Sequence, residues 1–127
     1  MKIFDRVAPW PDKVNFVDDN NVVVGYDMDQ SCCERAGWYI STALRTDIDD
    51  GCTTDPATLG DYDFDPKFFE HVESADVNEG GMVRFRLVRR DAPWLDVYLH
   101  IFNSHNGYYS HGFTFTAQDK TIQDGSL

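Results

Sequence analysis

The stretch LDVYLHIFN, residues 95–103, is apolar on both of its alternating faces. Aliphatic residues occupy the odd positions from Leu95 to Ile101, and Tyr98 and Phe102 stand between them at even positions. Alternation with a period of two predicts a β-strand, and a strand that is apolar on both faces is usually central and covered on both sides. We therefore expect residues 95–103 to form a central strand of an antiparallel sheet.

The dipeptide Asn106-Gly107 follows this strand closely. Asn-Gly is the strongest short signal for a two-residue β-hairpin turn, so it predicts a return strand over residues 113–117. Residues that oppose each other across a hairpin share a face of the sheet, and this register would make His100 and His111 neighbours on an aromatic face. Such a face is typical of a small-ligand pocket with histidines at its rim or, alternatively, of a packed core in which the histidines are inert.

Three other segments carry clear signals. Residues 13–17 and 21–26 flank the turn-forming run DDNN, which predicts a hairpin. Residues 83–88 alternate between apolar and mainly basic positions, which predicts a further strand. Pro9-Trp10-Pro11 should prevent regular structure in the first sixteen or so residues, and the tail from Gln118 onward is expected to be frayed.

Residues 31–34, SCCE, match a helix capping box, in which the serine caps the helix and the glutamate bonds back to it. Apolar and small residues then recur at helical spacing as far as Leu44, which predicts a short helix. Gly37 disfavours a helix interior, and the adjoining WYI would also suit a strand. Residues 47–65 are acidic and rich in turn formers, so we interpret them as a long surface loop.

Together these elements predict an α+β fold, an antiparallel β-sheet with hairpins and one short helix. The alternative is an all-β, barrel-like sheet. Hydrophobic residues make up 42% of the chain and aromatic residues 14%, which is enough for a globular core. Nothing repeats and no linker divides the sequence, so residues 1–127 are expected to form a single domain.

The chain is strongly acidic, with 22 Asp and Glu residues against 11 Lys and Arg, for a net charge of −11. Such a surface repels nucleic-acid phosphates and anionic membranes, so binding to either is not expected. The charge would serve solubility, attract a basic protein partner, or mimic a nucleic acid. A small ligand is the other partner that the sequence leaves open.

Three cysteines, Cys32, Cys33 and Cys52, are an odd number and include an adjacent pair, unlike a secreted disulfide framework. The first residues contain no apolar leader. We therefore expect a soluble, cytoplasmic protein with free thiols. A thiol in the first turn of a helix has a lowered pKa, so Cys32 or Cys33 with His105 would be the candidate catalytic dyad of an acyl-transfer enzyme. The alternative is that both cysteines are small apolar groups.

Four arginines, at positions 84, 86, 89 and 90, form the one basic cluster of the sequence. Arg84 and Arg86 would anchor an anion-binding patch for phosphates or nucleotides, or else the cluster forms salt bridges with the many acids of the chain. Two histidines on one face also suggest the hypothesis of a metal site, but zinc requires three or four ligands. We predict no metal and no cofactor.

The motifs CCE at residues 32–34 and HNGYY at residues 105–109 together resemble the signature of a family of small, uncharacterised proteins of bacteria and their phages. The resemblance would cover about residues 13–115. It implies a strand over residues 68–77, a shared fold and a shared site, but no reaction. Arg35 stands where the family often has a histidine, and the loop over residues 47–65 is longer than usual; both differences disfavour a metal.

The sequence therefore predicts a binding site rather than a reaction, and the most direct hypothesis is a non-enzymatic binding protein. The family's range makes a phage protein that acts on a host defence component a further hypothesis. The alternatives are a small Cys/His-dependent enzyme and a metal- or nucleotide-binding module. The candidate ligand-binding residues are Cys32, Cys33, Glu34, His100, His105, Asn106, Gly107, Tyr108, Tyr109 and His111.

Overall fold

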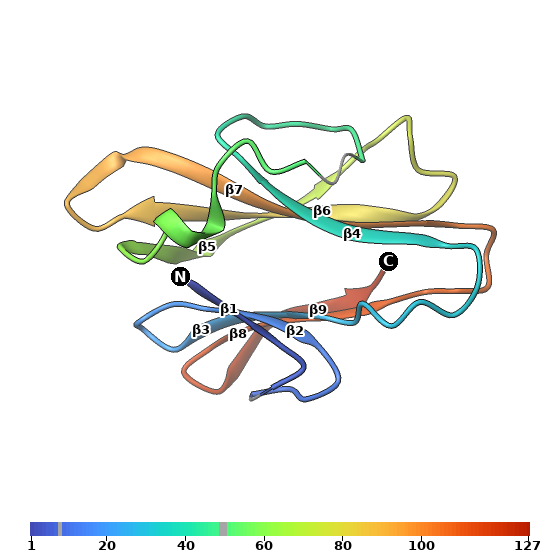
Figure 1. Cartoon of the computed structure of the whole chain (residues 1–127), viewed down its shortest axis with the longest axis horizontal. Helices are drawn as coiled ribbons and strands as arrows, with labels where there is room; N and C mark the ends of the chain where they lie inside the picture. Colours follow the sequence, from blue (N-terminus) through green and yellow to red (C-terminus); the bar gives the residue numbers. More distant parts are fainter. Residues whose placement is uncertain (8, 49–50) are drawn as a thin grey trace.

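The computed structural model, which describes residues 1–7, 9–48 and 51–127, contains two antiparallel sheets packed face to face (Figure 1). The first sheet has the strand order β1 (Lys2–Asp5), β2 (Val14–Val17), β3 (Val22–Tyr26), β8 (Gly112–Ala117) and β9 (Lys120–Ser126). The second has the order β4 (Arg35–Ser41), β7 (Ala92–His105), β6 (Glu79–Arg89) and β5 (Tyr62–Val72). The predicted antiparallel sheet is confirmed, although as two open sheets and not as a barrel.

Strand β7 is central, as its sequence predicts, because it pairs with β4 on one side and with β6 on the other. Leu99 and Ile101 point into the core between the two sheets. On the opposite face Phe102 packs in a second cluster with Tyr39 and Met82. Both faces of β7 are therefore covered, and each buried side chain of this size contributes roughly 1.5–3 kcal/mol to stability.

The predicted helix after Ser31 is wrong, because residues 35–41 form strand β4. Alternation explains the outcome: Ala36, Trp38 and Ile40 pack against the core between the sheets, whereas Tyr39 lies in the cluster on the other face. The Trp38 ring meets Phe16 of the facing sheet edge to face, with ring centroids 5.1 Å apart. Within the described residues, the helical segment is the short 3-10 turn η1 (Pro56–Thr58).

The predicted hairpin at Asn106-Gly107 is also wrong. Strand β8 pairs with β3 and β9, so it lies in the other sheet from β7. Both edges of β7 are already occupied by β4 and β6, and no edge remains for β8. Gly107 does adopt a left-handed conformation, with φ +102°, but it lies in a crossing between the sheets. His100 and His111 consequently lie in different layers and are not neighbours.

The ends of the chain are more ordered than their sequences predict. The hairpin of β2 and β3 is confirmed. However, β1 precedes the Pro9-Trp10-Pro11 run and pairs with β2, so the first residues do contain regular structure. The tail that was predicted to be frayed forms β9. The turn between β8 and β9 places Gln118 and Asp119 in the left-handed region, with φ 52° and 67°. Turn geometry of this kind matches the twist of a tight hairpin even without an Asn-Gly signal.

The strand implied by the family resemblance at residues 68–77 is present in part as the end of β5. The predicted loop over residues 47–65 is confirmed only up to residue 61, because residues 62–65 already belong to β5. Its described part contains η1, while residues 49–50 lie outside the described part. None of the helical structure in the described chain is long and apolar enough to cross a bilayer.

Candidate functional site

Two crossings between the sheets lie side by side at one end of the sandwich. Residues 27–34 lead from β3 to β4, and residues 106–111 lead from β7 back to β8 (Figure 1). They are neighbours because β3 pairs with β8 and β4 pairs with β7, with Arg35 opposite Ser104. The structure thus brings the Cys-Cys-Glu and His-Asn-Gly motifs to the same end of the molecule.

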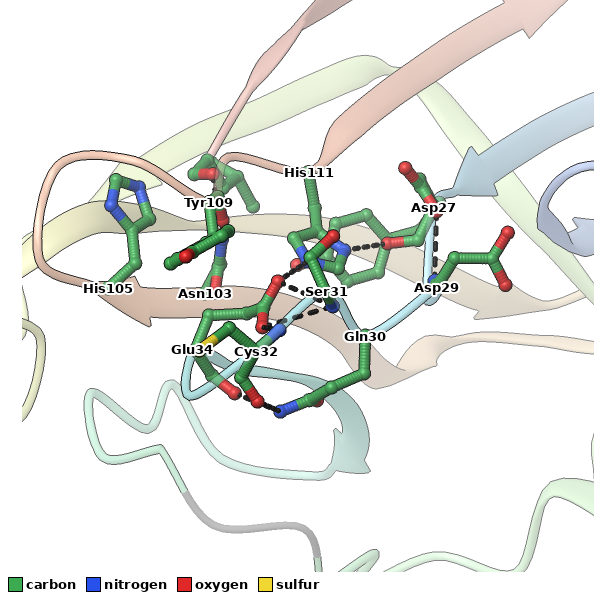
Figure 2. A network of polar contacts seen from close by, with 12 residues as sticks. Asp27, Asp29, Gln30, Ser31, Cys32, Glu34, Asn103, His105, Tyr109 and His111 are labelled. Carbon is green, nitrogen blue, oxygen red and sulfur yellow. Dashed lines mark hydrogen bonds and ion pairs between the residues drawn. The ribbon is translucent and has the colours of Figure 1, made fainter.

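A buried pair, Glu34 and His111, joins the two crossings. The imidazole Nε2 lies 2.8 Å from Glu34 Oε2, and the two side chains are 1% and 0% exposed. The other ring nitrogen, Nδ1, lies 2.6 Å from the carbonyl oxygen of Asp27. Glu34 also accepts backbone N–H bonds from Ser31 and Cys32 (Figure 2). His111 therefore holds both the first and the last residue of the 27–34 crossing.

The partners of this pair define its protonation state. A carbonyl oxygen only accepts, so Nδ1 of His111 donates, and the carboxylate of Glu34 already accepts two backbone N–H groups. Burial opposes charge on Glu34, but the hydrogen bonds from His111, Cys32 and Ser31 outweigh it and lower its pKa to about 2. Burial likewise opposes charge on His111, and its bonds to Glu34 and Asp27 outweigh this effect and raise its pKa. The pair is a buried imidazolium–carboxylate bridge.

Further side-chain bonds fix both crossings in place. Gln30 Nε2 donates to the carbonyl oxygens of Cys32 and Glu34, at 3.1 and 2.6 Å. Asn103, fully buried at the end of β7, donates to the carbonyl oxygen of Tyr109 at 2.8 Å. Because these bonds do not involve any ligand, the end of the sandwich is organised before a ligand arrives, which lowers the entropy cost of binding.

The adjacent thiols are exposed at the surface of this end. The helix whose dipole was expected to act on these thiols is absent, because β4 follows them. Instead, the neighbouring Cys32 thiol raises the pKa of Cys33 above its ordinary value. The same thiol raises the pKa of the Tyr109 hydroxyl. A raised pKa disfavours a reactive thiolate at Cys33.

His105 does not have the geometry of a base for these thiols. Its Nδ1 accepts a hydrogen bond from the backbone N–H of Gly107 at 2.8 Å. A neutral imidazole with an acceptor at Nδ1 carries its proton on Nε2, so neither nitrogen is free to take a thiol proton. Figure 2 also shows His105 pointing away from the Glu34–His111 pair. This arrangement disfavours the Cys–His acyl-transfer hypothesis.

A pocket of about 330 Å³ lies between the motifs, on the side of the crossings where His105 lies. Four segments of the chain contribute to its lining. The lining residues are Cys33 and Arg35, then Ile48, then Asn78 and Glu79, and last Ser104, His105 and Asn106. Tyr108 projects from the neighbouring crossing and is 83% exposed. The sequence predicted the cysteine and the late motif, but it missed the residues that the register adds. Asn78 and Glu79 line the pocket because β6 pairs with β7 there, with Glu79 opposite His105.

His100 lies outside this site, on the outward face of β7. Its ring stacks on Tyr39 with centroids 4.4 Å apart, and its Nε2 accepts a bond from Arg84 Nε at 3.0 Å. Arg84 also donates to Glu70 at 2.7 Å and to the carbonyl oxygen of Arg45 at 2.6 Å. Burial, aided by the Arg84 charge, lowers the pKa of His100 to about 4. His100 is thus a neutral core residue.

We expect His100 to make stability fall in mild acid. Unfolded His100 takes up a proton near pH 6.5, but the folded protein excludes it until about pH 4. The free energy of unfolding should therefore fall by about 3 kcal/mol as pH falls through this range. Urea unfolding at several pH values measures the slope. In His100→Gln, which still accepts the Arg84 bond but does not titrate, this part of the slope should vanish; an unchanged slope would contradict the assignment.

The other arginines of the basic cluster also pair with acids. Arg86 bonds to Asp96 at 2.9 Å and lies 3.5 Å from Asp65. The remaining pairs are Arg89 with Asp91, and Arg90 with Asp19 and Asp63. With Arg84 buried beneath Glu70 and Arg86 held between two carboxylates, the arrangement favours internal salt bridges over an anion-binding patch.

No group of three or more His, Cys, Asp or Glu residues in the described chain is placed to hold a metal ion. No protein-family model, curated protein or solved structure matches the chain.

Proposed function

We propose that the protein is a non-enzymatic binding protein, and that it binds through the end of the sandwich where the two crossings meet. The observation that carries the proposal is the pocket between Cys33 and His105, with the exposed Tyr108 two residues beyond Asn106 of its lining. We call the pocket lining together with Tyr108 the crossing surface. An exposed tyrosine beside a hollow is typical of a protein-binding surface, because aromatic anchors provide much of the binding energy of interfaces.

The rigidity of the crossing surface supports binding over catalysis. Glu34 and His111 have a lowered and a raised pKa respectively, but both are buried and bonded to each other. They hold the crossings rather than face a ligand. The polar groups that line the pocket are two amides, a hydroxyl, an imidazole whose Nδ1 is already bonded, a thiol with a raised pKa, and one charge of each sign, Arg35 and Glu79. Such groups supply hydrogen bonds and contact area more readily than acid–base chemistry.

The net charge of −11 supports a basic protein as the partner, since an acidic surface steers basic surfaces toward it. A phage protein that acts on a host defence component remains part of the proposal, with the family resemblance as its support. The three free thiols support a reducing compartment such as the cytoplasm.

Tyr108→Ala is expected to weaken capture of the partner at least about tenfold, because it removes the exposed aromatic anchor of the crossing surface. The matched control is Trp94→Ala, which removes an aromatic that is 76% exposed near the start of β7, whereas the crossing follows the last residue of that strand. Tagged wild type and both variants would capture proteins from the native host, with quantitative mass spectrometry and then titration calorimetry on the purified partner. Equal capture by wild type and Tyr108→Ala would contradict the proposal.

A further inference from the structure

Trp10 lies directly on the outward face of the first sheet. It sits over Gly25 of β3, where a Cβ atom would come within 2.7 Å of the indole Cε3. The glycine thus makes room for the ring in the middle of the sheet. The proline on each side of Trp10 restricts the backbone that carries the ring.

The loop that carries Trp10 is fixed from beneath by Asn15, which is fully buried. The Asn15 Nδ2 atom lies 2.9 Å from the carbonyl oxygen of Trp10, and it also contacts the carbonyl oxygens of Val7 and Lys13. A bond of 3.1 Å from Lys13 N to the Trp10 carbonyl closes the turn. Because the buried amide of Asn15 bonds to the backbone of this loop, the indole is held in one place without a ligand.

A pocket of about 240 Å³ adjoins the ring. Its floor is formed by the buried residues Val23 and Thr116, and its rim by the exposed residues Asn21, Asp119 and Thr121. The rim joins two turns of the sheet, because Gln118 N donates to the carbonyl oxygen of Asn21 at 3.1 Å. The pocket therefore has one aromatic wall, a floor of one valine and one threonine, and a polar rim.

The same face has a second hollow of about 400 Å³, lined in part by Lys13, Thr114 and Asp124. Lys13 and Thr114 both approach Gly25, within 3.1 Å of where its Cβ would lie. Since Trp10 approaches the same glycine, the indole lies between the two hollows. A ligand longer than one ring would extend from one hollow to the other past the indole.

The chemistry of this surface selects the ligand. The lining of the smaller pocket contains no cation and includes the carboxylate of Asp119, so it disfavours anions. Lys13, beside the second hollow, is paired with Asp12 at 3.1 Å. An indole face offers apolar area to C–H groups, while hydroxyl, amide and carboxylate groups bond to hydroxyls. We infer that the outward face of the first sheet is a binding site for a neutral saccharide stacked on Trp10.

Titration calorimetry with neutral hexasaccharides of glucose, mannose and N-acetylglucosamine, and with an anionic polygalacturonate oligomer, tests this inference. At least one neutral probe should bind, and the anionic probe should not. Trp10→Ala should weaken binding at least about tenfold. Because Trp10→Ala also removes packing on Gly25, Thr121→Val provides a second test, with an expected loss of roughly three- to tenfold from the missing hydroxyl.

Trp94→Ala and Tyr108→Ala are the controls, because both residues lie outside the two hollows, and neither should change the affinity for the saccharide. The inference is overturned if no neutral probe binds at about 1 mM, if only the anionic probe binds, or if Trp10→Ala and Thr121→Val both retain full affinity. Since the crossing surface is probed by Tyr108→Ala alone, failure of the saccharide site and failure of the proposed protein-binding function are distinguishable.

Discussion

Glu34→Ala is expected to lower the free energy of unfolding by about 3–5 kcal/mol, because it leaves a buried cation without its partner. The imidazole of His111 would lose the carboxylate that lies 2.8 Å from its Nε2. The backbone N–H groups of Ser31 and Cys32 would lose their acceptor as well. Since His111 holds both ends of the 27–34 crossing, the whole crossing should loosen along with the pair.

Urea unfolding of wild type and variant near pH 6 measures this effect. The matched control is Asp29→Ala. Asp29 lies in the same crossing as Glu34, and its substitution breaks an ion pair with Arg6, which lies outside the crossing. Those two side chains are 52% and 62% exposed, so water replaces the interaction and the loss should stay within about 1 kcal/mol. If Glu34→Ala proved as mild as Asp29→Ala, the buried bridge would not hold the crossing.

The same pair predicts a loss of stability at both ends of the pH range. Glu34 has its pKa lowered from 4.5 to about 2, so its contribution is present above pH 4.5 and is lost as pH falls toward 2. His111 has its pKa raised above 6.5, so its contribution is complete below pH 6.5 and is lost as pH rises through the raised value. Glu34→Ala should flatten the stability curve at both ends.

The sequence predicts strands where a single segment contains the whole signal. Residues 95–103 are apolar on both parities, and that pattern alone identifies a covered, central strand. The capping box at residues 31–34 is a partial success of a different kind. Glu34 does bond back to the backbone N–H of Ser31, as the motif predicts, but without a helix. The local hydrogen bond forms because it requires only the backbone of the crossing. The helix does not form, because the alternation of apolar residues over residues 35–41 favours strand β4.

The site depends on information that no single segment carries. The sequence predicted that the cysteines and the late motif would meet, but it assigned His111 to the wrong neighbour, His100. The true partner, Glu34, is 77 positions away along the chain, and the contact follows from two strand pairings in different sheets. An Asn-Gly turn signal does not say whether the chain returns in its own sheet or crosses to the other one. Only the occupancy of both edges of β7 decides that.

Gly80→Ala should be the most damaging of the glycine substitutions at this end of the molecule, with an expected loss of about 3 kcal/mol or more. Gly80 has φ +92°, and an added Cβ would lie 2.3 Å from the backbone oxygen of Asn103. It would also lie 3.0 Å from His105 Cδ2. The contact is with backbone of the central strand, so no side-chain rotation relieves it.

Substitutions at two other glycines separate the two contributions to this loss, backbone strain and the steric clash of the added Cβ. Gly107 has φ +102° but open space around its missing Cβ, so Gly107→Ala should cost only the backbone strain, about 1–2 kcal/mol. Gly81 has an ordinary backbone, and its nearest neighbour would be Leu127 Cδ2 at 3.4 Å, so Gly81→Ala should be nearly neutral. Thermal and urea unfolding should rank the losses in that order, Gly80 first. A loss at Gly80 no larger than at Gly107 would show that β6 and β7 do not approach this closely, and the pocket beside His105 would then lose the wall that Asn78 and Glu79 provide.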